Sequence, residues 1–422
     1  MKPASFSAWV CVCLFACAAL PLCIANYDHG RAFSDQMTYH YPAIVHFARG
    51  GGVADYSSAT TPGFHLLLAA VAKWISGSEL ALKLANFTLT ATLLGLVARS
   101  VAQQVKSGTL TVVMLLPMLF SIYVLPSGVW LLPDNLAWLT VFCLLYLAGR
   151  YRHDWRWYGL ASLTLVAAVL VRQSNLWLCL VVFAVAWRSE PARDNNASAR
   201  WLTRVSAAVL AAIPSIIVLA YFFHIWHGMT PPAFAERHTG LNPAALPFSA
   251  CLLAFYSLFY LPLIVGQVRE LLARARARIQ LCLGGAAGLL TAAGTPTDWD
   301  PASGRVSGLW NLAKVLPQIQ HRSVSIILLA TLGGALAAAW LSMTQPRTRV
   351  VAASAFLGFI IAQSASHFVY ERYYAGLIFL LILMMAADVL SRSPLPPRWS
   401  LAGPLLFATI NAGILGAGLF SS

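Results

Sequence analysis

Charged side chains are scarce along the whole chain. Asp, Glu, Lys and Arg make up 10% of the 422 residues, whereas soluble domains carry about 25% charged residues. Apolar residues make up 59%, and the few charges are spread over the entire length instead of marking off a polar domain. The composition therefore argues against a soluble globular protein and predicts an all-α integral membrane protein, with residues 1–422 forming a single membrane domain.

Several chemical signatures are missing as well. The eight cysteines lie mostly in apolar runs and form no CxxC pair, and the histidines lack the spacing of metal ligands, so we expect neither a disulfide framework nor a metal site. The chain has no phosphate-binding GxxxxGK[ST] loop and no nucleophile elbow. The net charge is +14, but no basic stripe can be drawn on a soluble face, so we expect no nucleic-acid partner. We expect no cofactor.

Apolar runs of membrane-spanning character are abundant. We expect about 13 transmembrane helices, within a range of 12 to 14, because a crossing requires about 20 apolar residues and several runs are short. The first run is interpreted as a retained helix and not as a cleaved signal peptide, because further spans follow it. The predicted spans are Phe6–Ala25, Leu80–Ala98, Leu110–Leu125, Asn135–Ala148, Tyr158–Val171, Leu176–Trp187, Val205–Phe223, Pro247–Val265, Ile279–Ala293, Val324–Leu341, Val350–Ser364, Tyr374–Leu390 and Leu401–Leu419.

Basic residues indicate the orientation of these spans. With the N-terminus in the cytoplasm and the spans alternating, most Lys and Arg side chains fall in cytoplasmic loops, as the positive-inside rule requires. If Phe64–Ile75 were a full span, every later loop would change side and the bias would reverse, so we expect an interfacial helix there. The basic cytoplasmic loops are 99–106, 150–156, 188–204, 269–278, 347–349 and 392–398.

The first external loop, residues 26–78, is the richest polar segment. Asp35 precedes Tyr39, His40 and Pro42, and Pro42 suits the first turn of a helix on the membrane surface. Asp35 has two interpretations at this point: a helix cap or merely solvated side chain, or a catalytic carboxylate. The run Thr60-Thr61-Pro62-Gly63 opens the next interfacial segment, and its threonines have the same two interpretations, capping or binding.

Other polar groups also fall on the external side. Arg172-Gln173-Ser174-Asn175 separates two short apolar runs. A charge at a membrane edge usually has a partner or a function, so Arg172 either binds phosphate or extends to the lipid headgroups. Asp134, the Arg237-His238 pair, and the run His367 to Tyr374, which holds Tyr370, Glu371 and Arg372, lie on this side too.

Two stretches of these residues, one within 35–63 and one at 172–175, resemble a known family most clearly. The chain is similar to the GT-C class of membrane glycosyltransferases, and most of all to the dolichyl-phosphate-glucose α-1,2-glucosyltransferases. The similarity rests on Asp35 with Tyr39, His40 and Pro42, on Thr60-Thr61-Pro62-Gly63, and on Arg172 to Asn175; Asp134 and the run His367 to Tyr374 match more loosely. The family has an acidic pair slightly closer to the proline, where this chain has Asp35-Gln36.

The resemblance implies an inverting glycosyltransferase with its active site on the external face. The compact loops and the Arg- and Ala-rich composition predict a bacterial inner-membrane protein, whose external face is periplasmic. The implied enzyme would move a sugar from a polyprenyl-phosphate donor to a glycan, lipid or protein acceptor, with Asp35 as general base. Arg172, with Arg372 or Arg237, would stabilise the departing phosphate. The substrate-binding residues it implies are Tyr39, His40, Thr60, Thr61, Asp134, Arg172, Gln173, Asn175, Arg237, His238, His367, Tyr370, Glu371 and Arg372.

Two other functions are compatible with a polytopic chain. A transporter or flippase would show polar residues in the middle of its spans and an internal repeat, whereas here charge is scarce within the runs and polar groups gather on one side. A non-catalytic assembly protein would tolerate Asp35→Asn without any change in glycan output.

Overall fold

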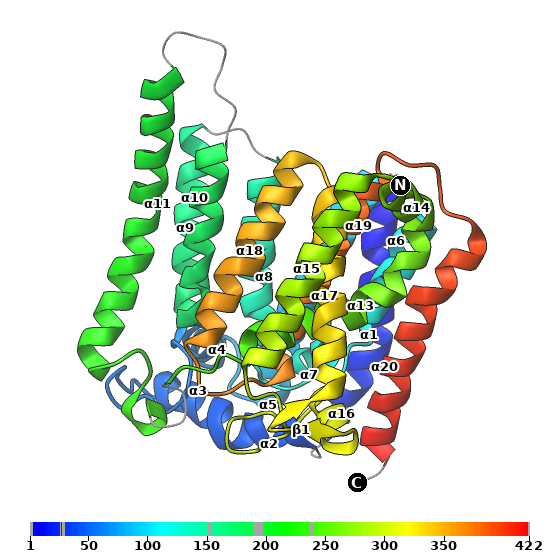
Figure 1. The fold of residues 1–422 in the computed structure, drawn as a ribbon. Helices are drawn as coiled ribbons and strands as arrows, with labels where there is room; N and C mark the ends of the chain where they lie inside the picture. The colour runs from blue at the N-terminus through cyan, green and yellow to red at the C-terminus, as the bar shows by residue number, and fades with distance from the viewer. Residues whose placement is uncertain are drawn as a thin grey trace.

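The chain folds into a bundle of roughly parallel helices (Figure 1). The computed structural model describes residues 3–25, 27, 30–150, 154–188, 197–235 and 240–420. These residues are almost entirely helical, and the single sheet among them is a two-stranded antiparallel hairpin, β1 (Gln318–Ile319) with β2 (Arg322–Ser323). The all-α prediction is confirmed.

The helices follow the apolar runs of the sequence. Ser78, Ser107 and Asp154 each cap the N-terminus of the helix that follows them, and Pro346 occupies the first turn of another. The long helices are α1 (Pro3–Ile24), α5 (Glu79–Val105), α6 (Gly108–Leu119), α8 (Asp134–Arg150), α9 (Trp155–Val171), α10 (Leu178–Arg188), α11 (Ala197–Trp226), α13 (Ala245–Tyr260), α15 (Ala275–Gly294), α17 (Val324–Met343), α18 (Pro346–Ser364), α19 (Glu371–Leu390) and α20 (Ala402–Phe420).

Each of the thirteen predicted spans overlaps one of these helices. Seven of the segments that the structure describes are long and apolar enough to cross a membrane, and α5, α11 and α19 are among them. Others, such as α6 and α9, have fewer than 18 residues. The protein is thus a multi-pass membrane protein, whereas thirteen crossings remain a prediction. The starting end of α1 and the final end of α20 lie at opposite ends of the bundle (Figure 1), as an odd number of crossings requires.

Helix α19 forms the centre of the bundle. In its apolar window 89% of the residues are buried, against 22% for the segment that contains α20. Helix α19 packs against α13, α5, α8 and α18, whereas much of α20 faces outward, where lipid would surround it. Polar side chains on α19 therefore lie inside protein and require partners there.

One end of the bundle carries most of the short elements, and it is the end that the sequence predicts to be external (Figure 1). They are α2 (Arg31–Asp35), the π-helix η1 (Gln36–His40), α3 (Tyr41–Ala48), α4 (Gly63–Trp74), α7 (Val124–Val129), η2 (Gln173–Trp177), η3 (Pro232–Phe234), α16 (Trp310–Val315) and the β-hairpin. The remaining elements η4 (Leu261–Ile264), α14 (Val265–Ala273) and η5 (Arg398–Leu401) connect helices elsewhere.

Asp35 does not cap a helix. It ends α2, and the chain continues without a break through η1 into α3, while its side chain forms no capping hydrogen bond. The amide of Tyr41 donates to the carbonyl of Gln36, five residues earlier. This wider turn brings residues five apart onto one face, and both Asp35 and His40 line the same cavity. The capping interpretation of Asp35 is therefore wrong.

Thr61 does not cap a helix either. Pro62 occupies the N-cap position of α4 and makes no side-chain cap. The hydroxyl of Thr61 instead donates to the carbonyl of Val169 at the end of α9. Gly63 is required at this junction, because a Cβ there would lie 2.5 Å from the carbonyl oxygen of Leu170. The start of α4 is thus held tightly against α9.

Candidate functional site

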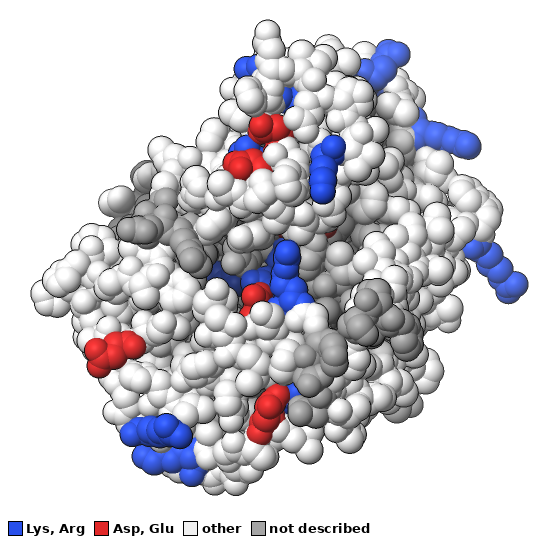
Figure 2. Space-filling model, turned by 90° about the horizontal axis from the view of Figure 1, so that it is seen from below, with Lys and Arg blue, Asp and Glu red and all other residues white. Residues whose placement is uncertain are grey.

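A cavity of about 670 Å³ opens at the external end of the bundle. Figure 2 shows it as a hollow in which acidic and basic side chains lie together. Its walls come from α1, α2, η1, α7, the start of α8, the end of α9, the loop before α16 and the start of α19. Elements far apart in the sequence therefore build one site.

Four charged side chains form a connected chain in this cavity. Arg372 Nη1 donates to Asp35 Oδ2 at 2.6 Å, and Arg372 Nε lies 3.8 Å from Asp134 Oδ2. The other oxygen of Asp134 accepts from Arg172 Nη2 at 2.8 Å. Asp134 is buried, whereas Asp35 and Arg372 keep about a quarter of their side chains exposed. In this series of ion pairs, the buried end at Asp134 is anchored, and the partly exposed end at Asp35 faces the cavity.

Tyr373 packs against both arginines of this chain. Its ring centroid lies 4.9 Å from the guanidinium carbon of Arg172 and 5.5 Å from that of Arg372. Such cation–π contacts favour a fixed position for planar guanidinium groups. The first turn of α19 thus provides a cation at 372 and the ring that orients it.

Glu371 faces away from Arg372 and serves the fold. Its Oε2 accepts from the amide of Leu309 at 2.6 Å, and Tyr123 is hydrogen-bonded to it as well. Gly308 has φ +59°, and a Cβ at that position would overlap the carboxylate of Glu371. Glu371 therefore holds the loop before α16 against α19, and it does not line the cavity.

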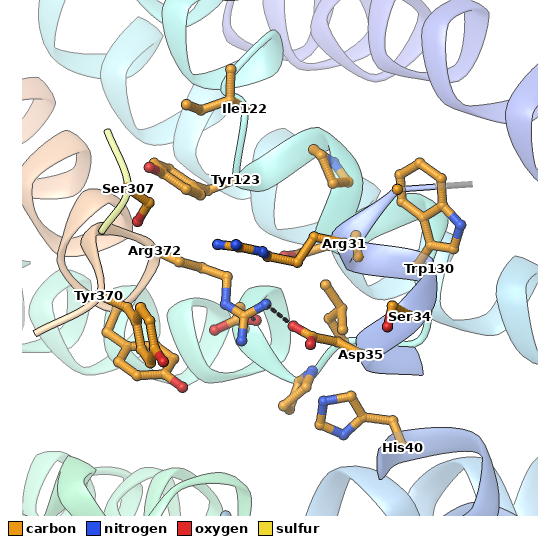
Figure 3. A pocket seen from close by; sticks show the side chains of 18 of the residues that line it. Arg31, Ser34, Asp35, His40, Ile122, Tyr123, Trp130, Ser307, Tyr370 and Arg372 are labelled. Atoms are coloured by element: carbon orange, nitrogen blue, oxygen red, sulfur yellow. Dashed lines mark hydrogen bonds and ion pairs between the residues drawn. The ribbon is translucent and has the colours of Figure 1, made fainter. Parts of the chain in front are cut away.

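Arg31 adds a further positive charge. It is exposed, it lines the cavity, and it forms no ion pair with any acidic side chain in the described part of the chain. Figure 3 shows its guanidinium extending into the cavity beside Arg372, with Asp35 and His40 on one side and Tyr123 and Tyr370 on the other. Two arginines are balanced by two aspartates here, so the charge of Arg31 is available to an anion.

Gln36, the residue next to Asp35, is fixed by its surroundings. Its Nε2 donates to Glu79 Oε1 at 2.7 Å, and its Oε1 accepts from the amide of Leu131 at 3.0 Å. Glu79 is in turn paired with the fully buried Lys83 at 2.7 Å. These bonds tie the end of α2 to α5 and to the segment before Asp134, and so hold Asp35 in place.

The two best-matching sequence blocks contact each other. Gln173 Oε1 accepts from the amide of Thr61 at 3.1 Å, and Gln173 Nε2 donates to the carbonyl of Ala59 at 2.9 Å. Asn175 is buried and donates to the carbonyl of Ala168. Of the predicted site residues in these two blocks, Arg172 and Thr60 line the cavity, next to Ala59; Thr61, Gln173 and Asn175 build its frame.

His40 is the cavity's buried imidazole. Its Nδ1 lies 2.9 Å from Nε2 of His65, and Nδ1 of His65 lies 2.7 Å from the hydroxyl of Tyr56. Burial, together with the nearby charges of Arg372 and Arg172, lowers the pKa of His40 to about 3. The ring is therefore uncharged at neutral pH.

The remaining predicted site residues are dispersed. Tyr39 and Tyr370 line the cavity, and Tyr39 packs edge-on against Phe234 at 5.7 Å between ring centroids. His367 lies off the cavity, and its backbone carbonyl accepts from Asn242. Arg237 and His238 lie outside the described residues. The sequence patterns did not single out the cavity residues Arg31, Tyr123, Trp130, Phe234, Ser307 and Tyr373.

The cavity suits an amphipathic ligand with an anionic group. Basic and acidic side chains gather in its middle, and apolar side chains from α1, α7 and the outward-facing α20 form the rest of its wall, including Leu22, Leu125, Ile414 and Leu415. Among the described residues, no group of three or more His, Cys, Asp or Glu side chains could hold a metal ion.

Comparison with known proteins returns no relative: no protein-family model, curated protein or solved structure matches this chain.

Proposed function

We propose that the protein is an inverting glycosyltransferase that uses a polyprenyl-phosphate-linked sugar. The observation that supports this most directly is the partly exposed Asp35–Arg372 pair in a cavity that also holds Arg31, which has no acidic partner among the described residues. One carboxylate and several cations in one partly apolar pocket match the needs of a reaction that removes a proton while a lipid phosphate departs.

Each residue has a distinct role in this proposal. The acceptor hydroxyl oxygen attacks the anomeric carbon, and its proton passes to Asp35. The bond from the anomeric carbon to the phosphate oxygen breaks, and the electron pair leaves with the polyprenyl phosphate. Arg31 and Arg372 neutralise that phosphate. Attack on the face opposite the leaving group inverts the anomeric configuration.

The ion pair seen between Asp35 and Arg372 fits a resting site. A donor phosphate would compete for Arg372, since guanidinium groups bind phosphate and carboxylate with similar geometry. When Arg372 turns to the phosphate, Asp35 is released towards the acceptor. Asp134 remains bound to Arg172 throughout and keeps the second arginine in position.

The apolar wall supplies the place for the lipid. Ile414 and Leu415 lie on α20 and Leu22 on α1, and α20 is largely exposed along its length. A polyprenyl chain lying against these helices would keep its phosphate at the level of the arginines. The predicted location is the bacterial inner membrane with the cavity on the periplasmic side, where the acceptor is a glycan, lipid or protein.

The test uses synthetic undecaprenyl-phosphate hexoses whose sugar is radiolabelled, and it measures transfer of the labelled sugar by the full-length protein in membranes. We expect Asp35→Asn to lower transfer by about 10²- to 10⁴-fold, the usual contribution of a general base, while the protein inserts into membranes normally. Asn has the size of Asp and can still bond to Arg372. Transfer near the wild-type rate by this variant would rule out Asp35 as the base.

The same assay separates an enzyme from a transporter. A flippase would move the intact labelled donor across a sealed vesicle without breaking the bond between sugar and phosphate. Protected, chemically unchanged donor inside the vesicles, with no labelled product, would contradict the proposed activity.

A further inference from the structure

Three buried side chains form a hydrogen-bonded line that ends at the cavity. The hydroxyl of Tyr56 lies 2.7 Å from Nδ1 of His65, and Nε2 of His65 lies 2.9 Å from Nδ1 of His40. The two imidazole rings are stacked with centroids 5.2 Å apart. Tyr56 and His65 are almost completely buried, and only His40 lines the cavity.

The number of protons in this line is fixed by its burial. Desolvation lowers the pKa of both histidines and raises that of Tyr56, so each ring carries one proton and the phenol keeps its own. Two of the three protons occupy the two hydrogen bonds. The third lies at one end of the line, on His40 or on Tyr56.

The surroundings of Tyr56 decide between the two ends. Among the described residues the phenol hydroxyl has one hydrogen-bond partner, Nδ1 of His65, and the hydroxyl of Thr60 has none, so that nitrogen is the acceptor for the buried phenol proton. Tyr56 therefore donates its own proton to Nδ1 of His65. His65 then donates from Nε2 to Nδ1 of His40, which leaves the proton of His40 on its Nε2 atom.

We propose that Tyr56, acting through His65, fixes His40 as an uncharged hydrogen-bond donor whose Nε2–H binds a hydroxyl oxygen of the sugar or the acceptor. The role in substrate binding rests on the proposed function, whereas the position of the proton does not. Arg31, Arg172 and Arg372 already supply positive charge in this cavity. A neutral donor adds a contact suited to a hydroxyl group without attracting a second anion.

The position of the proton can be measured without any substrate. Full-length protein with ¹⁵N-labelled histidine in lipid nanodiscs is studied by solid-state NMR at pH 7, and the signals are assigned with His40→Gln and His65→Gln. We expect both rings to be protonated on Nε2 and unprotonated on Nδ1. A protonated Nδ1 on His40, or a doubly protonated ring, would overturn the proposal.

Tyr56→Phe tests the control exerted from the far end of the line. Without the phenol, nothing fixes His65, and we expect the His40 signal to become a mixture of both tautomers. An unchanged single tautomer in this variant would show that Tyr56 does not set the role of His40.

Binding is tested with labelled undecaprenyl-phosphate glucose. We expect His40→Phe to lower kcat/KM by about tenfold, the effect of losing one neutral hydrogen bond, and His40→Gln, which retains an N–H donor, to recover most of it. His46→Gln, at a histidine outside the cavity, is the matched control. Equal losses in the Phe and Gln variants would contradict the donor role. Absence of transfer by the wild-type protein would count against the proposed function, while the NMR measurement would still decide the tautomer.

Discussion

An ion pair between Arg and Asp lies at each end of α19, and the two pairs differ in their surroundings. At the external end Arg372 pairs with Asp35, and both side chains remain about a quarter exposed inside a cavity. At the other end Asp388 pairs with Arg392 at 3.0 Å, but Asp388 also accepts from the amide of Gln345 and the hydroxyl of Thr348. Asp388 is 7% exposed and has hydrogen bonds on both oxygens.

The two aspartates differ in how many of their oxygen lone pairs are still free to accept a hydrogen bond. Asp388 is surrounded by donors from its own fold and ties the start of α18 to α19, so it has no bond left for a ligand. Asp35 has one ion pair and an open cavity in front of it. An ion pair on its own therefore does not indicate a functional site, whereas an ion pair that is accessible and incompletely bonded does.

Of the changes at the two ends of α19 itself, removal of the cation at the external end should have the largest effect. We expect Arg372→Ala to lower kcat/KM for a polyprenyl-phosphate sugar by about 10²- to 10³-fold, because a positioned donor to the developing charge is lost. The measurement is transfer of labelled sugar by protein in membranes.

Arg392→Ala, at the opposite end of α19 where Asp388 is bonded on both oxygens, is the control for this change. Its side chain is 45% exposed, and we expect transfer within about twofold of wild type, in keeping with the small contribution of exposed ion pairs. Equal losses in the two variants would remove the distinction between the ends of α19.

Substitution of Asp388, at the end of α19 opposite the cavity, should affect stability instead of activity. Asp388→Ala leaves the amide of Gln345 and the hydroxyl of Thr348 without their acceptor, which costs about 1–3 kcal/mol for a buried group. We expect a lower melting temperature in detergent and normal activity per folded molecule. A variant that melts like wild type but transfers no sugar would place Asp388 in the reaction.

Low pH should destabilise the folded protein at its external end. The folded-state pKa of His40 is lowered to about 3, below its unfolded value of about 6.5, so the unfolded chain binds the proton more readily between these values. Stability from the buried neutral ring is therefore complete above about pH 6.5 and declines as pH falls towards 3.

The corresponding measurement is the melting temperature from pH 7.5 to pH 5. We expect a decline in the wild-type protein and a shallower one in His40→Gln, because glutamine does not titrate. Parallel curves for the two proteins would mean that His40 is not held in its neutral form.

Much of the fold follows from hydrophobic patterning. A bilayer requires long apolar helices, so every predicted span overlaps a helix, and the short run after Pro62 folds as the separate helix α4. Broken helices are harder to predict. Leu110–Leu125 reads as one span, but the chain leaves the helix after Leu119 and begins α7 at Val124.

The site was partly predictable for a different reason. Asp35, Asp134, Arg172 and Arg372 stand out as charges in an apolar sequence, and all four meet in the cavity. Their partners were not predictable, since the Asp35–Arg372 bond joins residues 337 positions apart. Gln173 and Asn175 show the converse problem, because a polar side chain that binds backbone has the same sequence signature as one that binds substrate.

The π-helical turn of η1 makes the length of this segment as important as its composition. In an α-helix, residues five apart point about 140° away from each other, so Asp35 and His40 share the cavity only because the turn between them is wide. Removal of one residue would leave them four apart, about 40° from each other in an α-helix and still on one face, whereas insertion of one would leave them six apart, about 120° from each other. Substitutions at the exposed positions Met37 and Thr38 leave the spacing intact. The segment should therefore tolerate changes in amino-acid type, and even the loss of one residue, far better than the insertion of one.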